Sequence, residues 1–279
     1  MGNPEYISAF IANTLSGRRR EKNVVMLHWG RSGSTVLGHL LHKNPDIFWD
    51  SEIFIGNRMP AIPRPMNKLL FRAPGLVIGV RRQRSRKPVY GFESKPSQIA
   101  RVGLNFAQFV AKLNAMHFSH YILLQRRNLL RIIISDSVAK QNGIWHRQRH
   151  RGHAVPKSSD QDARPSAIRI DVNAVALGSS FQRNRMSLLE HLRAIEDEYQ
   201  QFNALLRDKT LLQMSYEEHI QQDPRVGYRR VCEFLAVSAP EVQVDLGKTN
   251  PWPVKEIVEN YDEVADVLAG TPYEWMLND

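Results

Sequence analysis

Residues 24–35, which read VVMLHWGRSGST, decide the fold. An apolar run of strand length is followed by a short loop of Gly and Ser with one Arg, and a helical pattern begins near Ser34. Glycines let the backbone approach a ligand, successive N–H groups can point inward, and the positive end of a helix favours an anion. The stretch predicts a phosphate or sulfate site, although a Gly/Ser turn of this kind is also compatible with a plain connection.

The spacing of this loop argues against a nucleoside triphosphate. A P-loop requires Gly, four residues and then Gly-Lys-Ser/Thr. Here only two residues separate Gly30 from Gly33, and Ser34 stands where the Lys would be. A nucleoside triphosphate with its metal ion is therefore not the expected ligand.

A second motif occupies residues 121–135, which read YILLQRRNLLRIIIS. An apolar strand is predicted to end before Arg127, Asn128 follows, and Ser135 lies eight residues after the Arg. With a helix after the strand, Arg127 and Ser135 can converge on one phosphate. Open α/β sheets bind ligands at this end of their strands. Taken singly, each residue is equally compatible with a solvated Arg or a packing Ser.

Together the two motifs resemble those of the sulfotransferases that use 3′-phosphoadenosine 5′-phosphosulfate (PAPS). Residues 31–35 are similar to the family's 5′-phosphosulfate loop, and Arg127 and Ser135 to its 3′-phosphate pair. The resemblance implies an α/β fold with a P-loop-like central parallel sheet flanked by helices on both faces. It also implies one domain over residues 1–279, PAPS as co-substrate and no metal.

The resemblance also implies roles for single residues. Arg31 would neutralise charge on the leaving phosphate, and the loop would hold the 5′-phosphate through backbone N–H groups and hydroxyls. Lys248, in a predicted loop over residues 246–253, matches a late basic loop that closes the nucleotide site. The implied donor-binding residues are Arg31, Ser32, Gly33, Ser34, Thr35, Arg127, Ser135 and Lys248.

Transfer to a hydroxyl also requires a general base. Glu52 is the candidate, because its distance from Arg31 resembles that of the catalytic Glu in the carbohydrate and tyrosylprotein branches of the family. Glu93 is a second base candidate, and Lys95 would steady the sulfuryl oxygens. Each of these three residues is also compatible with an ordinary charge at the end of a strand or in a loop.

Hydrophobic periodicity places the remaining elements. Residues 3–17 predict a leading helix followed by a basic segment to residue 21, and residues 147–173 predict an acceptor-side loop or lid, or simple disorder. Strands are predicted at 24–28, 89–93, 121–125 and 211–215, with an extended piece at 46–49. Helices are predicted at 34–42, 105–115 and 181–207, the last with an apolar stripe that forms core.

The composition restricts the function classes. A net charge of +10 and a pI near 9.9 predict affinity for a multiply charged anion. The lone Cys232 is predicted to be a core residue of a helix and excludes an intramolecular disulfide. No stretch is long and apolar enough to cross a bilayer. Many animal carbohydrate members of the family carry a membrane anchor, so the resemblance then implies a cytoplasmic, bacterial enzyme without one. The expected partner is a carbohydrate or small-metabolite acceptor, not a nucleic acid.

Three alternatives stay open. A P-loop kinase would need a loop Lys and a magnesium-holding Asp, and a non-catalytic polyanion-binding protein is favoured by charge alone. A metal site at His146, His150 and His153 is opposed by the Arg residues between them. The identity of the acceptor and the oligomeric state carry no readable signal.

Overall fold

The computed structural model describes residues 22–55, 73–84, 86–143, 147–148, 166–175, 186–248 and 250–278. The chain divides into two compact units. The first comprises Met1–Gln125 and Gln200–Val242, and the second Arg126–Tyr199 and Gln243–Asp279. The predicted leading helix over residues 3–17 lies outside the described residues, and the single domain stays a prediction.

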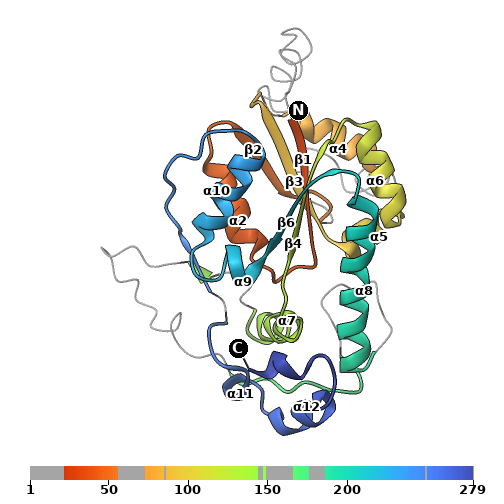
Figure 1. The fold of residues 1–279 in the computed structure, drawn as a ribbon, viewed down its shortest axis with the longest axis vertical. Helices are drawn as coiled ribbons and strands as arrows, with labels where there is room; N and C mark the ends of the chain where they lie inside the picture. The colour runs from red at the N-terminus through yellow and green to blue at the C-terminus, as the bar shows by residue number, and fades with distance from the viewer. Residues whose placement is uncertain are drawn as a thin grey trace. The chain divides into compact units, whose positions relative to one another are not determined.

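A five-stranded sheet forms the centre of the first unit (Figure 1). Its strands, in the order β2-β3-β1-β4-β6, are all parallel. Parallel strands must be joined by crossovers, so all their carboxyl ends meet at one edge. The α/β fold with a central parallel sheet is therefore confirmed. The strands are β1 (Lys22–His28), β2 (Ile47–Glu52), β3 (Val89–Ser94), β4 (His120–Gln125) and β6 (Thr210–Ser215).

Helices cover this sheet. In Figure 1, α2 and α10 lie together on one side of the strands, and α4 and α6 lie on the other. The start of α6 follows its sequence, because Asn105 Oδ1 accepts a hydrogen bond from the N–H of Gln108, whose side chain accepts from Asn105 N–H. The helices are α2 (Ser34–Lys43), α4 (Pro74–Arg82), α5 (Pro96–Arg101), α6 (Phe106–Ala115), α9 (Tyr216–His219) and α10 (Pro224–Phe234).

The core of the first unit is rich in aromatic rings. Phe92 on β3 makes an edge contact with Phe118 at a centroid distance of 5.4 Å and a further one with Phe54. All side chains of β3 are buried, which is typical of a parallel strand covered on both faces. Cys232 is fully buried on α10, as predicted.

The second unit contains α7 (Leu130–Asn142), α11 (Val254–Ile257), α12 (Tyr261–Leu268) and a short 3₁₀ helix, η1 (Glu274–Leu277). Two short strands, β5 (Arg147–Gln148) and β7 (Leu246–Gly247), pair antiparallel. The loops predicted over residues 147–173 and 246–253 thus both begin with a strand, and the sequence-based expectation is wrong at those residues. Two-residue strands are stabilised only by the pairing itself, so they leave no local periodicity.

Helix α8 (Leu188–Leu206) begins later than predicted. Met186 pairs with Val175 in an isolated bridge, and Ser187 then caps the helix. The Glu190 carboxylate accepts hydrogen bonds from the backbone and hydroxyl of Ser187, completing a capping box that the periodicity had concealed. The predicted apolar stripe is core, since Leu188, Leu192, Ile195 and Phe202 are fully buried.

No helix in the part of the chain that the structure describes is both long and apolar enough to span a bilayer.

Candidate anion-binding and catalytic site

The candidate site lies at the carboxyl edge of the sheet, where β1, β2 and β3 end. His28 is the last residue of β1, Glu52 the last of β2, and Glu93 lies at the end of β3, one residue before its final Ser. β1 is the central strand, with β3 and β2 on one side and β4 and β6 on the other. The loop after β1 therefore lies where the connections of the sheet run to opposite sides. Open α/β sheets bind ligands at such a point.

The loop after β1 has an unusual backbone. Gly30, Arg31 and Gly33 all have positive φ, at 93°, 51° and 84°. Gly33 precedes α2, and a Cβ at that position would lie 2.6 Å from Cγ2 of Ile220, so both its conformation and its packing require Gly. The N–H groups of Ser34, Thr35 and Val36 have no intrahelical acceptor, because the first such bond runs from Leu37 N–H to Gly33 O. The loop therefore carries the donors that an anion needs.

Ser32 and Ser34 are buried within this loop, whereas Thr35 is exposed. Oγ of Ser32 is inaccessible and has no hydrogen-bond partner among the described residues. At Ser32, the backbone N–H is therefore a better candidate than the buried hydroxyl for binding an anion.

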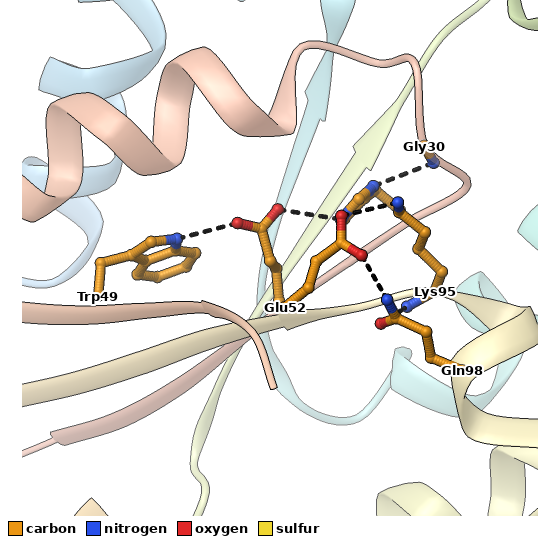
Figure 2. A network of polar contacts seen from close by, with 7 residues as sticks. Gly30, Trp49, Glu52, Lys95 and Gln98 are labelled. Atoms are coloured by element: carbon orange, nitrogen blue, oxygen red, sulfur yellow. Dashed lines mark hydrogen bonds and ion pairs between the residues drawn. The ribbon is translucent and has the colours of Figure 1, made fainter. Parts of the chain in front are cut away.

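Glu52 lies in a network of donors (Figure 2). Its Oε1 is 2.7 Å from Nζ of Lys95, and its Oε2 accepts a hydrogen bond from the side chain of Gln98. Oε1 of Gln98 accepts in turn from Lys95 N–H at 3.2 Å, at the start of α5. The amide of Gln98 is therefore oriented by the backbone, and it orients Glu52.

An irregularity in β2 places Glu52 in this network. Trp49 pairs with Gly91, but Glu52 pairs with Glu93, so the register shifts between Trp49 and Glu52. Ser51 within this bulge has φ 51°. Bulges redirect side chains at the ends of strands, and this one brings Glu52 to Lys95, the residue that directly follows β3.

The environment of Glu52 favours its charged form. Burial opposes ionisation, but the Lys95 ammonium, the neighbouring His28 ring and the hydrogen bonds from Lys95 and Gln98 together outweigh it, so the pKa of Glu52 lies below its usual value. The carboxylate is therefore ionised at neutral pH and able to accept a proton from an acceptor hydroxyl.

Glu93 is in a different environment. It is only 3% exposed, its Oε1 accepts from Nε1 of Trp49 at 3.4 Å, and its Oε2 lies 3.1 Å from Nε2 of His28. That last pair is within hydrogen-bond distance but poorly aligned for a bond. Of the two base candidates, Glu52 has the more accessible carboxylate, with its side chain 15% exposed.

One atom each from His28, Glu52 and Glu93 lie within 4.8 Å of one another, a spacing that a metal ion could bridge. The donor set does not fit a metal as it stands. Nδ1 of His28 accepts the N–H of Gly30 at 3.0 Å, so Nε2 carries the ring proton and offers no lone pair to a cation. Lys95 already supplies the cation at Glu52. Metal-independent chemistry stays a prediction, and residues 146, 150 and 153 lie outside the described residues.

The residues predicted to bind the 3′-phosphate belong to the second unit. Arg127 is exposed, two residues after β4, and Ser135 is buried on α7, as the motif predicted. Asn128 has a structural role there, since its Oδ1 accepts from Arg131 N–H and its Nδ2 donates to Met276 O. Lys248 is exposed directly after β7.

The structure thus brings Glu52, Lys95 and Glu93 together at the edge where the Arg31 loop begins. Sequence reasoning missed His28, Trp49 and Gln98. A His inside an otherwise apolar strand, next to the loop, was the available signal for His28, whereas Gln98 was signalled only by the third helical position after Lys95. The sequence matches no protein-family profile, and a search of curated proteins found no similar one.

Proposed function

We propose that the protein is a sulfotransferase that moves the sulfuryl group of PAPS to a hydroxyl of a carbohydrate or small specialised metabolite. One observation carries the proposal: the loop of Gly30, Arg31 and Gly33, with three positive φ angles, follows the central strand of a parallel sheet at the edge that also holds the Glu52–Lys95 pair. Anion donors and an ionised acid lie at one sheet edge. The P-loop-like character and the cytoplasmic location are part of the proposal.

The proposed reaction is an in-line transfer. A bond forms between the acceptor oxygen and sulfur while the bond from sulfur to the bridging oxygen of PAPS breaks. The hydroxyl proton passes to Glu52, and adenosine 3′,5′-bisphosphate leaves. Arg31 and Lys95 neutralise charge on the phosphate and sulfuryl oxygens, which is where positioned cations lower the barrier. Backbone N–H groups of residues 32–35 hold the 5′-phosphate.

The rest of the donor site is proposed from the second motif. Arg127 and Ser135 would bind the 3′-phosphate, because guanidinium and hydroxyl groups donate well to phosphate oxygens. Lys248 would add charge at the same nucleotide. The net charge of +10 supports a donor that carries several negative charges.

A kinase is less well supported. In a kinase an acid at the end of a strand beside the loop would hold magnesium. Glu93 lies at that position, but its oxygens face Trp49 and His28, and no Lys occupies the loop. Charge alone supports a non-catalytic polyanion-binding protein, and that proposal leaves the Glu52 network without a function.

Calorimetric titration with adenosine 3′,5′-bisphosphate without metal tests the proposal, beside magnesium-ATP and adenosine 5′-phosphate. We expect micromolar binding of the bisphosphate only, followed by turnover of PAPS with an acceptor from a panel of hydroxyl compounds. Preference for magnesium-ATP would favour the kinase. Absence of nucleotide binding would favour the polyanion-binding protein.

A further inference from the structure

His28 occupies a position that the proposed chemistry does not use. It ends β1, its side chain is completely buried, and it lies between the anion loop and Glu93. Its Nδ1 accepts a hydrogen bond from Gly30 N–H at 3.0 Å (Figure 2). A fully buried polar ring that bonds to a loop two residues away is available to shape that loop.

This bond defines the tautomer of His28. A ring nitrogen that accepts an N–H must have a free lone pair, so Nδ1 is unprotonated. The remaining ring proton is on Nε2, which faces Oε2 of Glu93 at 3.1 Å. Oε1 of Glu93 is occupied by Trp49. Glu93 thus lies on the proton-bearing side of the ring, and the Gly30 loop lies on the acceptor side.

The conformation of the loop at this point is strained. Gly30 and Arg31 are both left-handed, a conformation that a non-Gly residue such as Arg31 rarely adopts. Such strain persists only where the surrounding structure determines it. The bond to His28 turns Gly30 N–H into the protein, so this N–H group does not face the proposed anion site. The backbone donors proposed for the anion are those of residues 32–35.

We propose that His28 is a positioning residue: through Nδ1 it holds Gly30 and Arg31 in the conformation that presents the loop N–H groups and the Arg31 side chain to the anionic donor. This inference rests on the proposed function. It leaves Glu93 beside Nε2 of His28, as the second candidate for the base.

Two substitutions separate this role from simple packing. In His28→Asn, Oδ1 is attached at the same carbon as Nδ1 of His, so it can still accept from Gly30 N–H. In His28→Gln, the amide lies near the position of Nε2 and can meet only Glu93. Asn is the smaller side chain and leaves the larger cavity, so packing alone predicts that Asn is worse in every measurement.

Binding of adenosine 3′,5′-bisphosphate is measured by calorimetry on the full chain, with thermal midpoints as the packing readout. We expect His28→Gln to weaken binding at least about tenfold, the magnitude of one lost hydrogen bond with its unpaired donor, and His28→Asn about threefold. The binding order is diagnostic because packing alone predicts the opposite order, and the thermal midpoints check that both variants fold. If His28→Asn binds the bisphosphate more weakly than His28→Gln, the proposal is overturned.

Nitrogen NMR of His28 in the unmodified protein is decisive whatever the ligand. We expect a pyridine-type shift for Nδ1 and a pyrrole-type shift for Nε2. A protonated Nδ1 would overturn the inference even if the bisphosphate binds. If the bisphosphate does not bind the unmodified protein, the proposed function fails. The role of His28 is then still tested by its tautomer and by the binding of inorganic pyrophosphate to the two variants.

Discussion

Nζ of Lys95 lies 2.7 Å from Oε1 of Glu52, and the same side chain runs beside the anion loop, where a Cβ on Gly30 would lie 3.4 Å from Cε of Lys95. One cation therefore borders both the acid that would accept a proton and the loop that would hold the donor.

Glu52→Gln should lower turnover by about 10² to 10⁴, the range for a positioned general base. Affinity for adenosine 3′,5′-bisphosphate should change less than about twofold, because the amide keeps the size and the hydrogen bond to Gln98. Single-turnover rates and calorimetry separate the two effects. Unchanged turnover would assign the base elsewhere, first to Glu93.

Lys95→Met should move the acidic limb of the pH–rate profile to higher pH. Lys95 is the main group that lowers the pKa of Glu52 against the effect of burial, so its loss raises that pKa and Glu52 becomes protonated at a higher pH. Lys95→Arg is the matched control, since it keeps the charge and should leave the limb nearly in place. Identical limbs for the Met and Arg variants would contradict the assignment of Glu52 as the base.

The same pair predicts a pH-dependent stability. Because the pKa of Glu52 is lower in the folded protein, its contribution is present above the unfolded value and is lost as the pH falls through the folded value. Lys95→Met leaves a largely buried carboxylate without its cation, so we expect a loss of about 1–3 kcal/mol at pH 7. Urea unfolding should show that this loss shrinks in acid. Adding Glu52→Gln to Lys95→Met should restore part of the stability, and a further loss would contradict the pairing.

Gly33→Ala should destabilise the fold and abolish bisphosphate binding. It combines a positive φ with a Cβ only 2.6 Å from Ile220. Gly103→Ala is the matched control, because Gly103 has φ 75° and nothing within 4 Å of an added Cβ. The control should cost about 1–2 kcal/mol from conformation alone, and Gly33→Ala about 1–3 kcal/mol more from overpacking. Equal losses in urea unfolding would show that packing against Ile220 is unimportant.

Arg127→Ala should weaken binding of adenosine 3′,5′-bisphosphate about 10- to 100-fold, the value of a charge-assisted hydrogen bond. Binding of adenosine 5′-phosphosulfate, which lacks the 3′-phosphate, should barely change. Parallel calorimetric titrations provide the comparison. An equal loss for both nucleotides would remove Arg127 from the 3′-phosphate site.

The sequence predicted the strands of the sheet well, because each buried parallel strand is a short apolar run bounded by polar residues. It predicted α8 poorly at its start, where Ser187 and Glu190 form a cap that continuous periodicity conceals. It also missed β5 and β7, whose two residues each are strands only because they pair with each other. Patterns in the local sequence predict those elements that are stabilised by local contacts or by burial of an apolar face.

The sequence by itself determined the strand, loop and helix over residues 24–43, since glycine conformation and helix capping act within a few residues. It also determined which chemical groups follow each strand. Only the tertiary structure decided how these groups meet. The bulge in β2 turns Glu52 towards Lys95, and the parallel register of β1 and β3 sets His28 against Glu93. These contacts join residues more than forty positions apart, where no local pattern records the register that unites them.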